Sequence, residues 1–139
     1  HGLKPVVRLN TTSDIMWENH KIMELFPKTQ FYDYSKHFKR MLKYLKGDMP
    51  KNYHLTFSRN EANDFQATQV LKAGGNVAVV FRKELPETYK GFKVITGDEH
   101  DLRFLDEANV VVGLKEKLSL NKATGKLDRD KSGFVVDLK

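Results

Sequence analysis

The most constraining feature of the sequence is a regular spacing of strand-like runs, separated by segments with helical character. The runs begin near positions 6, 31, 53 and 77, a repeat of about 22 to 25 residues. Parallel strands need a crossover of about a dozen or more residues, usually a helix. A closed barrel needs eight such units and roughly 250 residues. The spacing therefore predicts an α/β fold with a parallel βαβαβαβ core, either a partial barrel or an open sheet.

The segments around these runs agree with that fold class. Residues 37–46 place apolar side chains at i, i+3, i+4 and i+7 with lysines opposite, the pattern of an amphipathic helix. Residues 76–81 (NVAVVF) are continuously apolar after the initial asparagine, as in a strand covered on both faces. Beyond position 82 the helical pattern stops and short strand-like runs predict a β-rich C-terminal part. These runs are residues 92–96, 109–114 and 133–138.

We expect a single domain over residues 1–139, with an exposed loop at 116–132 that is rich in Lys, Asp, Asn and Gly. The chain starts with His instead of Met, which predicts that it is the C-terminal part of a longer protein. Cysteine is absent, which excludes disulfides, thiolate metal ligands and a Cys nucleophile from these residues. No apolar run approaches the roughly 18 residues of a membrane span, and no signal-peptide pattern is present. We therefore expect a cytoplasmic protein.

The net charge of +6 suits nucleic acid or another anionic partner, although such a charge also serves solubility. The basic face of the predicted helix at 37–46 is the candidate nucleic-acid surface, and a solvated helix face is the alternative. Its candidate residues are Lys39, Arg40, Lys43 and Lys46.

Polar side chains alternate with apolar ones along the first three strand-like runs. Strand side chains alternate between faces, so these polar residues are predicted to share one face of the sheet. They are Arg8, Asn10, Asp33, Ser35, His54, Thr56 and Ser58. Two explanations fit: Arg8 and Asp33 form a buried ion pair, or the residues line a ligand cleft at the carboxyl ends of parallel strands. In the second case Asp33 and His54 are candidate catalytic residues, and Arg8, Asn10, Ser35 and Ser58 candidate ligand-binding residues.

A polar turn at 98–101 (DEHD) is the second candidate site. Carboxylates and an imidazole suit a divalent metal or proton transfer, so Asp98, His100 and Asp101 are candidate catalytic residues. An ordinary solvated acidic turn is the alternative, and the identity of any metal is left open.

Several stretches together resemble the gene product 88-like family of bacteriophage and prophage proteins. They are VVRLNTTSDIMWE, FYDYSK, NYHLTFS, NVAVVF and ITGDEHDLRFLDEANVVVGLK. Longer members of that family carry an upstream cysteine cluster similar to the iron–sulfur segment of radical SAM-like barrels. For this chain, iron–sulfur or SAM chemistry is implied only if such an upstream segment exists. The resemblance adds Ser13, Asp14, Lys36 and Arg103 to the candidate ligand-binding residues, and implies a bacterial host cell.

The sequence thus favours a phage-type enzyme or enzyme fragment with a polar ligand pocket at the strand carboxyl ends. The alternative is a non-catalytic module that binds nucleic acid or a phage or host protein through the basic helix.

Overall fold

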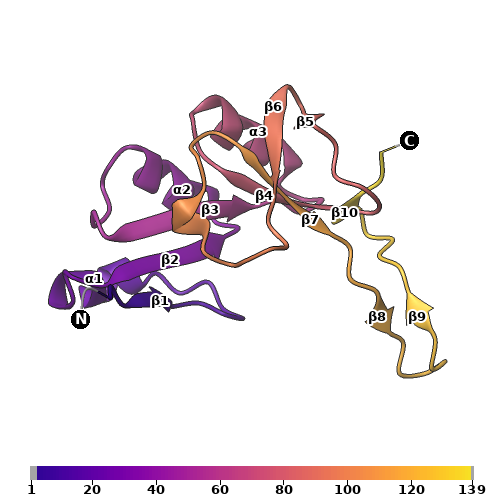
Figure 1. Ribbon diagram of the computed structural model, residues 1–139, viewed down its shortest axis with the longest axis horizontal. Helices are drawn as coiled ribbons and strands as arrows, with labels where there is room; N and C mark the ends of the chain where they lie inside the picture. Colours follow the sequence, from indigo (N-terminus) through magenta and orange to yellow (C-terminus); the bar gives the residue numbers. More distant parts are fainter. Residues whose placement is uncertain (1–2, 139) are drawn as a thin grey trace.

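The computed structural model describes residues 3–138 and contains one mostly parallel sheet with helices packed on one face (Figure 1). The sheet order is β1-β2-β3-β4-β7-β6-β5, in which only β5 runs antiparallel to its neighbour. The strands are β1 (Val6–Arg8), β2 (Gln30–Ser35), β3 (Tyr53–Ser58), β4 (Val77–Phe81), β5 (Thr88–Tyr89), β6 (Phe92–Thr96) and β7 (Val111–Lys115). The predicted α/β class and the mostly parallel sheet are confirmed.

The helices are fewer and shorter than a regular βα alternation requires. Helix α2 (Phe38–Leu45) joins β2 to β3, and α3 (Asp64–Lys72) joins β3 to β4. Between β1 and β2 lie only the 3-10 turn η1 (Trp17–His20) and the one-turn helix α1 (Ile22–Leu25). The 3-10 turn η2 (Arg103–Leu105) lies between β6 and β7.

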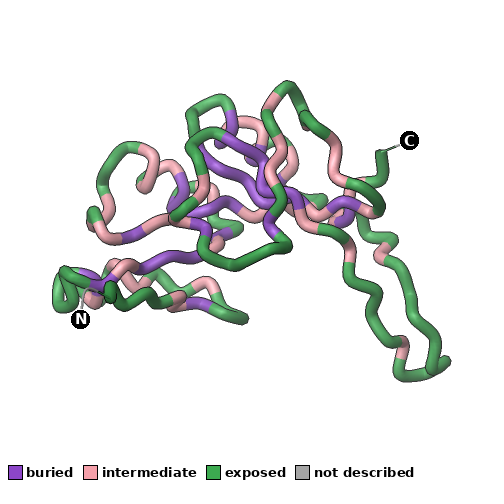
Figure 2. Tube along the Cα trace, viewed as in Figure 1, coloured by how far each residue is buried: buried purple, intermediate pink, exposed green. Residues whose placement is uncertain are grey.

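The apolar core lies between the sheet and the helices α2 and α3. Strand residues with odd numbers, such as Leu55, Phe57 and Val79, are buried there against Met41 and Val70. Figure 2 shows the buried residues concentrated along the central strands. This face of the sheet, called the helix face below, is the main source of hydrophobic stabilisation.

Two features of the C-terminal part shape the edge of the sheet. Strand β3 pairs only with the start of β4, and β10 (Val135–Val136) takes its place beside Val80 and Phe81. The predicted exposed loop at 116–132 is exposed, but it contains the hairpin strands β8 (Ser119–Leu120) and β9 (Leu127–Asp128). In Figure 1 this hairpin projects away from the body of the molecule. None of the helices within residues 3–138 is long and apolar enough to cross a membrane.

Candidate functional site

The strand register divides the predicted polar face between two sides of the sheet. Asp33 is the partner of Leu55, and Ser35 is the partner of Phe57, so both carboxylate and hydroxyl point to the helix face. His54 is the partner of Tyr32 on the opposite face. The prediction of one shared polar face is therefore wrong. Because side chains alternate with a period of two, a register offset of one residue between neighbouring strands exchanges the faces.

On the helix face, Asp33 is the centre of a closed hydrogen-bond network. Its side chain is fully buried and accepts hydrogen bonds from Asn10 N at 2.8 Å, Asn10 Nδ2 at 3.0 Å and the Tyr53 hydroxyl at 3.0 Å. Burial raises the pKa of Asp33, while these hydrogen bonds and the charge of Arg40 oppose the rise. The proposed ion pair with Arg8 is not formed, because Arg8 pairs with Asp101 on the other face.

Arg40 belongs to the same network. Its guanidinium donates to Glu18 at 3.0 and 2.9 Å, to Asp14 at 2.9 Å and to the Tyr53 hydroxyl. The side chain is 1% exposed. The prediction that Arg40 lies on an exposed basic face is therefore wrong. The exposed lysines of that helix region are Lys36, Lys39, Lys43 and Lys46.

The remaining members of the network fix the loop after β1. Asn10 Oδ1 accepts hydrogen bonds from the Ser13 hydroxyl, Ile15 N and Trp17 Nε1. Asp14 accepts from the Ser35 hydroxyl and from Lys36 N. We call this set the scaffold network: Asn10, Asp14, Glu18, Asp33, Ser35, Arg40 and Tyr53. Its polar groups are satisfied by one another, which is the arrangement of a structural cluster.

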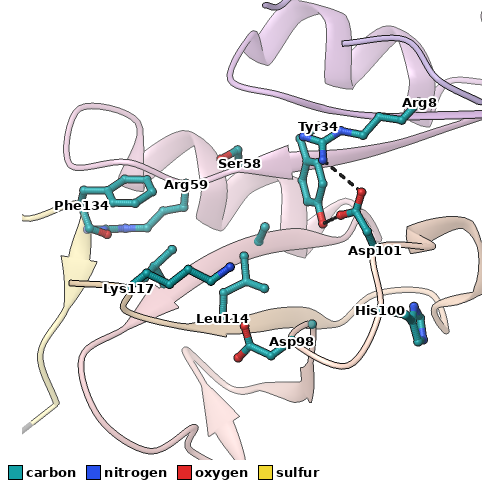
Figure 3. A pocket seen from close by; sticks show the side chains of 13 residues that line it. Arg8, Tyr34, Ser58, Arg59, Asp98, His100, Asp101, Leu114, Lys117 and Phe134 are labelled. Carbon is teal, nitrogen blue, oxygen red and sulfur yellow. Dashed lines mark hydrogen bonds and ion pairs between the residues drawn. The ribbon is translucent and has the colours of Figure 1, made fainter. Parts of the chain in front are cut away.

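On the opposite face, a pocket of about 580 Å³ lies over the carboxyl ends of β2, β3, β4 and β7 (Figure 3). Its floor is apolar and includes Ala78, Val80 and Leu114. We call it the carboxyl-edge groove. The predicted residues that line it are Arg8, Ser58, Asp98, His100 and Asp101. A second pocket of about 320 Å³ shares Arg8, Tyr34 and Ser58 with it and is bordered by the loop after β1. The other predicted ligand-binding residues that line this second pocket are Asn10, Ser13, Asp14, Ser35 and Lys36.

Asp101 fixes one wall of the groove. It accepts hydrogen bonds from Arg8 Nη1 at 3.0 Å and from the hydroxyls of Tyr32 and Tyr34, each at 3.2 Å. The Arg8 guanidinium lies 4.8 Å from the centre of the Tyr34 ring. Burial and the Asp101 carboxylate raise the pKa of Tyr34, so its hydroxyl stays protonated and donates to Asp101. These contacts hold a cation and an aromatic ring in place at the groove.

The opposite wall is formed by residues that the sequence did not identify as candidates. Arg59 Nη1 donates to the carbonyl oxygens of Gly133 at 2.7 Å and Phe134 at 2.8 Å, and Arg59 Nε donates to Asp64. Figure 3 shows Phe134 and Arg59 side by side, with Lys117 extending toward the middle of the groove. A cation directly after strand β3 was the available signal for Arg59. No sequence signal links Lys117 or Phe134 to this edge.

His100 and Asp98 differ in their access to the groove. His100 Nδ1 accepts a hydrogen bond from Leu102 N at 3.1 Å, which assigns the proton of the neutral ring to Nε2. Figure 3 shows His100 directed away from Asp98. Asp98 Oδ2 accepts only the backbone N–H of Lys115 within residues 3–138. No group of three or more His, Asp or Glu side chains in that part of the chain could hold a metal ion.

Two further predicted residues lie outside the groove, His54 on β3 and Arg103 in η2 itself. Arg103 is fully buried, donates to the His100 carbonyl oxygen and pairs with Asp106 at 3.4 Å. Gly97 leaves room for it, because a Cβ there would lie 2.6 Å from Arg103 Nη1. Burial and the nearby Arg103 charge lower the pKa of His54 to about 4. His54 and Arg103 therefore do not line the groove, and His54 borders a separate pocket with Asp106.

The iron–sulfur expectation does not fit these residues. Iron–sulfur clusters are held by cysteine thiolates, and the 139 residues contain none. We therefore derive no chemistry through such a cluster.

Comparison with known proteins agrees with the sequence resemblance. Residues 1–138 match the family described as gene product 88. Comparisons with curated proteins and with solved structures gave no match, and nothing in them links the chain to radical SAM-like barrels. Since the match extends over nearly the whole chain, this protein belongs to the gene product 88 family.

Proposed function

We propose that the carboxyl-edge groove binds a nucleotide-like ligand, an aromatic base that carries a phosphate. The observation that supports this is the combination of groove-lining cations and aromatic rings over an apolar floor. The cations are Arg8, Arg59 and Lys117, and the rings are Tyr34 and Phe134. Ligands of parallel α/β sheets bind outside the carboxyl ends of the strands, and a volume of about 580 Å³ lies within the range of small-molecule sites.

The charges around the groove favour an anion. Arg8 is neutralised by Asp101, but the pair is half-exposed and Arg8 still faces the groove. Asp64 is shared between Arg59 and Lys90, so one carboxylate partners two cations. Lys117 is exposed and has no ion-pair partner within residues 3–138. A phosphate bound here would accept hydrogen bonds from charged donors, which are stronger than those between neutral groups.

The apolar floor and the rings favour a planar, aromatic part of the ligand. Ala78, Val80 and Leu114 offer a surface without hydrogen-bonding side chains. Stacking of a base on an aromatic ring contributes about 1–3 kcal/mol. Phe134 has the ammonium of Lys36 5.5 Å from its ring centre on one side. A base stacked on Phe134 would therefore lie next to cations that can reach its phosphate.

Three residues predicted as catalytic line the groove, Asp98, His100 and Asp101, and we assign a chemical role to Asp98. It is exposed, lines the groove and has one oxygen that accepts no hydrogen bond within residues 3–138. Asp101 is occupied by three donors, and Asp33 and His54 lie elsewhere. If the protein is an enzyme, Asp98 is the groove residue that we assign to proton transfer or to binding a ligand-borne cation.

Calorimetric titration with AMP, GMP, CMP and UMP tests the proposal, with the matching nucleosides and inorganic phosphate as partial ligands. We expect a nucleotide to bind more tightly than either part. Lys117→Ala should weaken binding about tenfold, the loss of one charge-assisted contact. Phe134→Ala should weaken nucleoside and nucleotide binding alike.

Lys72→Ala is the matched control, since Lys72 is an exposed lysine at the end of α3 that lines none of the pockets described above. It removes the same charge and should leave binding unchanged. The proposal is overturned if no nucleotide binds at millimolar concentration, or if Lys117→Ala and Lys72→Ala have the same effect.

A second candidate surface is the exposed side of α2. Lys39, Lys43 and Lys46 remain exposed there although Arg40 is buried. This surface corresponds to the alternative of a nucleic-acid or host-protein binder, and the triple variant described in the next subsection tests it.

A further inference from the structure

The hairpin that contains β8 and β9 begins at the rim of the carboxyl-edge groove. Lys117 lies at the start of the hairpin and Phe134 just beyond its end, and both residues line the groove. We call residues 116–133 the arm. The strands pair antiparallel, with Ser119 opposite Asp128 and Leu120 opposite Leu127. From position 117 to 122 an extended chain covers about 17 Å, so the arm extends the groove surface well beyond a single nucleotide.

One arginine fixes the base of the arm to the sheet. We call this base, which contains Glu116 and Asp130, the root. Arg82, which follows β4, donates to Glu116 at 3.1–3.2 Å, to Asp137 at 2.9 Å and to the carbonyl oxygen of Asp130 at 2.7 Å. Asp130 also accepts hydrogen bonds from Ser132 and from Val135 N. Both legs of the arm are therefore held at a defined position beside the groove, and the carboxylates of Glu116 and Asp130 are used within the root.

The cations of the arm have no such partners. Five basic side chains lie along it, and within residues 3–138 none of them forms an ion pair. They are Lys117, Lys122, Lys126, Arg129 and Lys131. The remaining carboxylate, Asp128, accepts a hydrogen bond from Asn121 Nδ2. The arm thus carries five cations, and neither the Asp128 nor the Asp130 carboxylate pairs with any of them within residues 3–138. This excess of positive charge favours an extended polyanion over a compact ligand.

One side of the arm is apolar as well. Leu118, Leu120 and Leu127 have exposed fractions of 45%, 63% and 61%. Leu120 and Leu127 are direct partners in the ladder and therefore lie on the same side. Unpaired bases have flat apolar faces that can cover such a surface, whereas the paired bases of a duplex are stacked on each other.

We propose that the arm binds the backbone of single-stranded nucleic acid that extends from a nucleotide held in the groove. The groove-bound end of this strand rests on the proposed function, while the contact of the arm with phosphates stands on the charges of the arm. Phosphates lie along the lysines, and bases lie against the leucines.

The test is fluorescence anisotropy with single-stranded DNA and RNA oligonucleotides of 4, 8 and 12 nucleotides and with a 12-base-pair duplex, at several salt concentrations. Affinity should rise with length and level off within about 4–16 nucleotides. The triple variant Lys122→Gln, Lys126→Gln, Arg129→Gln should weaken binding of the 12-mer at least tenfold. It should also reduce the salt dependence by about 0.7 per lost phosphate contact. Calorimetric binding of a mononucleotide should not change.

The triple variant Lys39→Gln, Lys43→Gln, Lys46→Gln removes three charges from α2 and is the matched control. Equal weakening by both triple variants shows a net-charge effect and overturns the inference. Greater weakening by the α2 variant assigns binding to α2 and also overturns it, as does tighter binding of the duplex. If oligonucleotides depend on the arm but mononucleotides do not bind, the groove proposal fails and the arm inference stands. If mononucleotides bind without any gain from length, the arm inference fails alone.

Discussion

The two polar clusters at the carboxyl edge of the sheet lie on opposite faces and differ in one physical respect. In the scaffold network every carboxylate is buried or half-buried and has protein donors, as Asp33 has three. In the carboxyl-edge groove Asp98 and Lys117 are exposed and keep groups without protein partners within residues 3–138. Buried polar groups must be satisfied inside the protein, whereas open ones remain available to a ligand. The scaffold network and the candidate site therefore contain similar residue types, and they differ in whether the polar groups have protein hydrogen-bond partners and whether solvent can reach them.

The largest expected effect on the free energy of unfolding comes from substituting Arg40 of the scaffold network. Arg40→Ala leaves the carboxylates of Glu18 and Asp14 without their cation in a poorly solvated place, and Glu18 has an exposed fraction of 5%. Removing one partner of a buried ion pair costs about 3–5 kcal/mol. We expect a loss of this size in the free energy of unfolding, measured with urea. Lys39→Ala, on the exposed side of the same helix, should change it by less than about 0.5 kcal/mol. A loss below 1 kcal/mol for Arg40→Ala would contradict the closed network.

The second difference concerns pH and His54. Its pKa falls from 6.5 to about 4 in the folded protein. Between these two pH values the unfolded chain therefore binds a proton at His54 more readily than the folded chain does. The contribution of the neutral His54 to the free energy of unfolding is complete above pH 6.5 and is lost as the pH falls toward 4. The loss reaches about 3 kcal/mol.

The measurement is the difference in unfolding free energy between wild type and His54→Gln as a function of pH. The difference should decrease as the pH falls from 7 to 4. If this difference in unfolding free energy stayed constant with pH, His54 would be accessible to water and not buried beside Arg103.

The third prediction concerns Asp33→Asn, and the matched substitution Asp101→Asn follows as the fourth. Asp33→Asn replaces an acceptor oxygen of the scaffold network with an amide that faces donors from Asn10 and Tyr53. We expect a loss of about 1–3 kcal/mol in unfolding free energy. Nucleotide binding by the folded variant should be unchanged. Lost binding with unchanged stability would instead make Asp33 a ligand-binding residue.

The smallest effect on stability is expected for Asp101→Asn. The ion pair with Arg8 is half-exposed, and such surface pairs contribute about 0–1 kcal/mol. The substitution should therefore change the unfolding free energy by less than 1 kcal/mol. Because Tyr34 and Arg8 lose a charged anchor, nucleotide affinity measured by calorimetry should change instead. A stability loss equal to that of Asp33→Asn would remove the distinction between the two faces.

The sequence predicted which polar residues lie at the carboxyl edge of the sheet better than it predicted which face of the sheet each one occupies. Arg8, Ser58, Asp98, His100 and Asp101 do lie around one pocket. Asp33 and Ser35 were assigned to the same face as His54 because alternation within each strand is readable, but the register between strands is not. Arg40 illustrates a second limit. Its helical position resembles that of the neighbouring lysines, and only the packing of the loop after β1 brings Asp14 and Glu18 to it.

By itself, the sequence determined the α/β class, the parallel strands and the position of the main helices. These depend on the periodicity of apolar residues and on the length of the crossovers, which are local properties. The tertiary structure decided which polar groups are enclosed and which remain open. It also brought Lys117 and Phe134 to the groove, since β10 joins the sheet beside β4 from the far end of the chain. Contacts between distant segments depend on register and packing, which no local pattern in one sequence specifies.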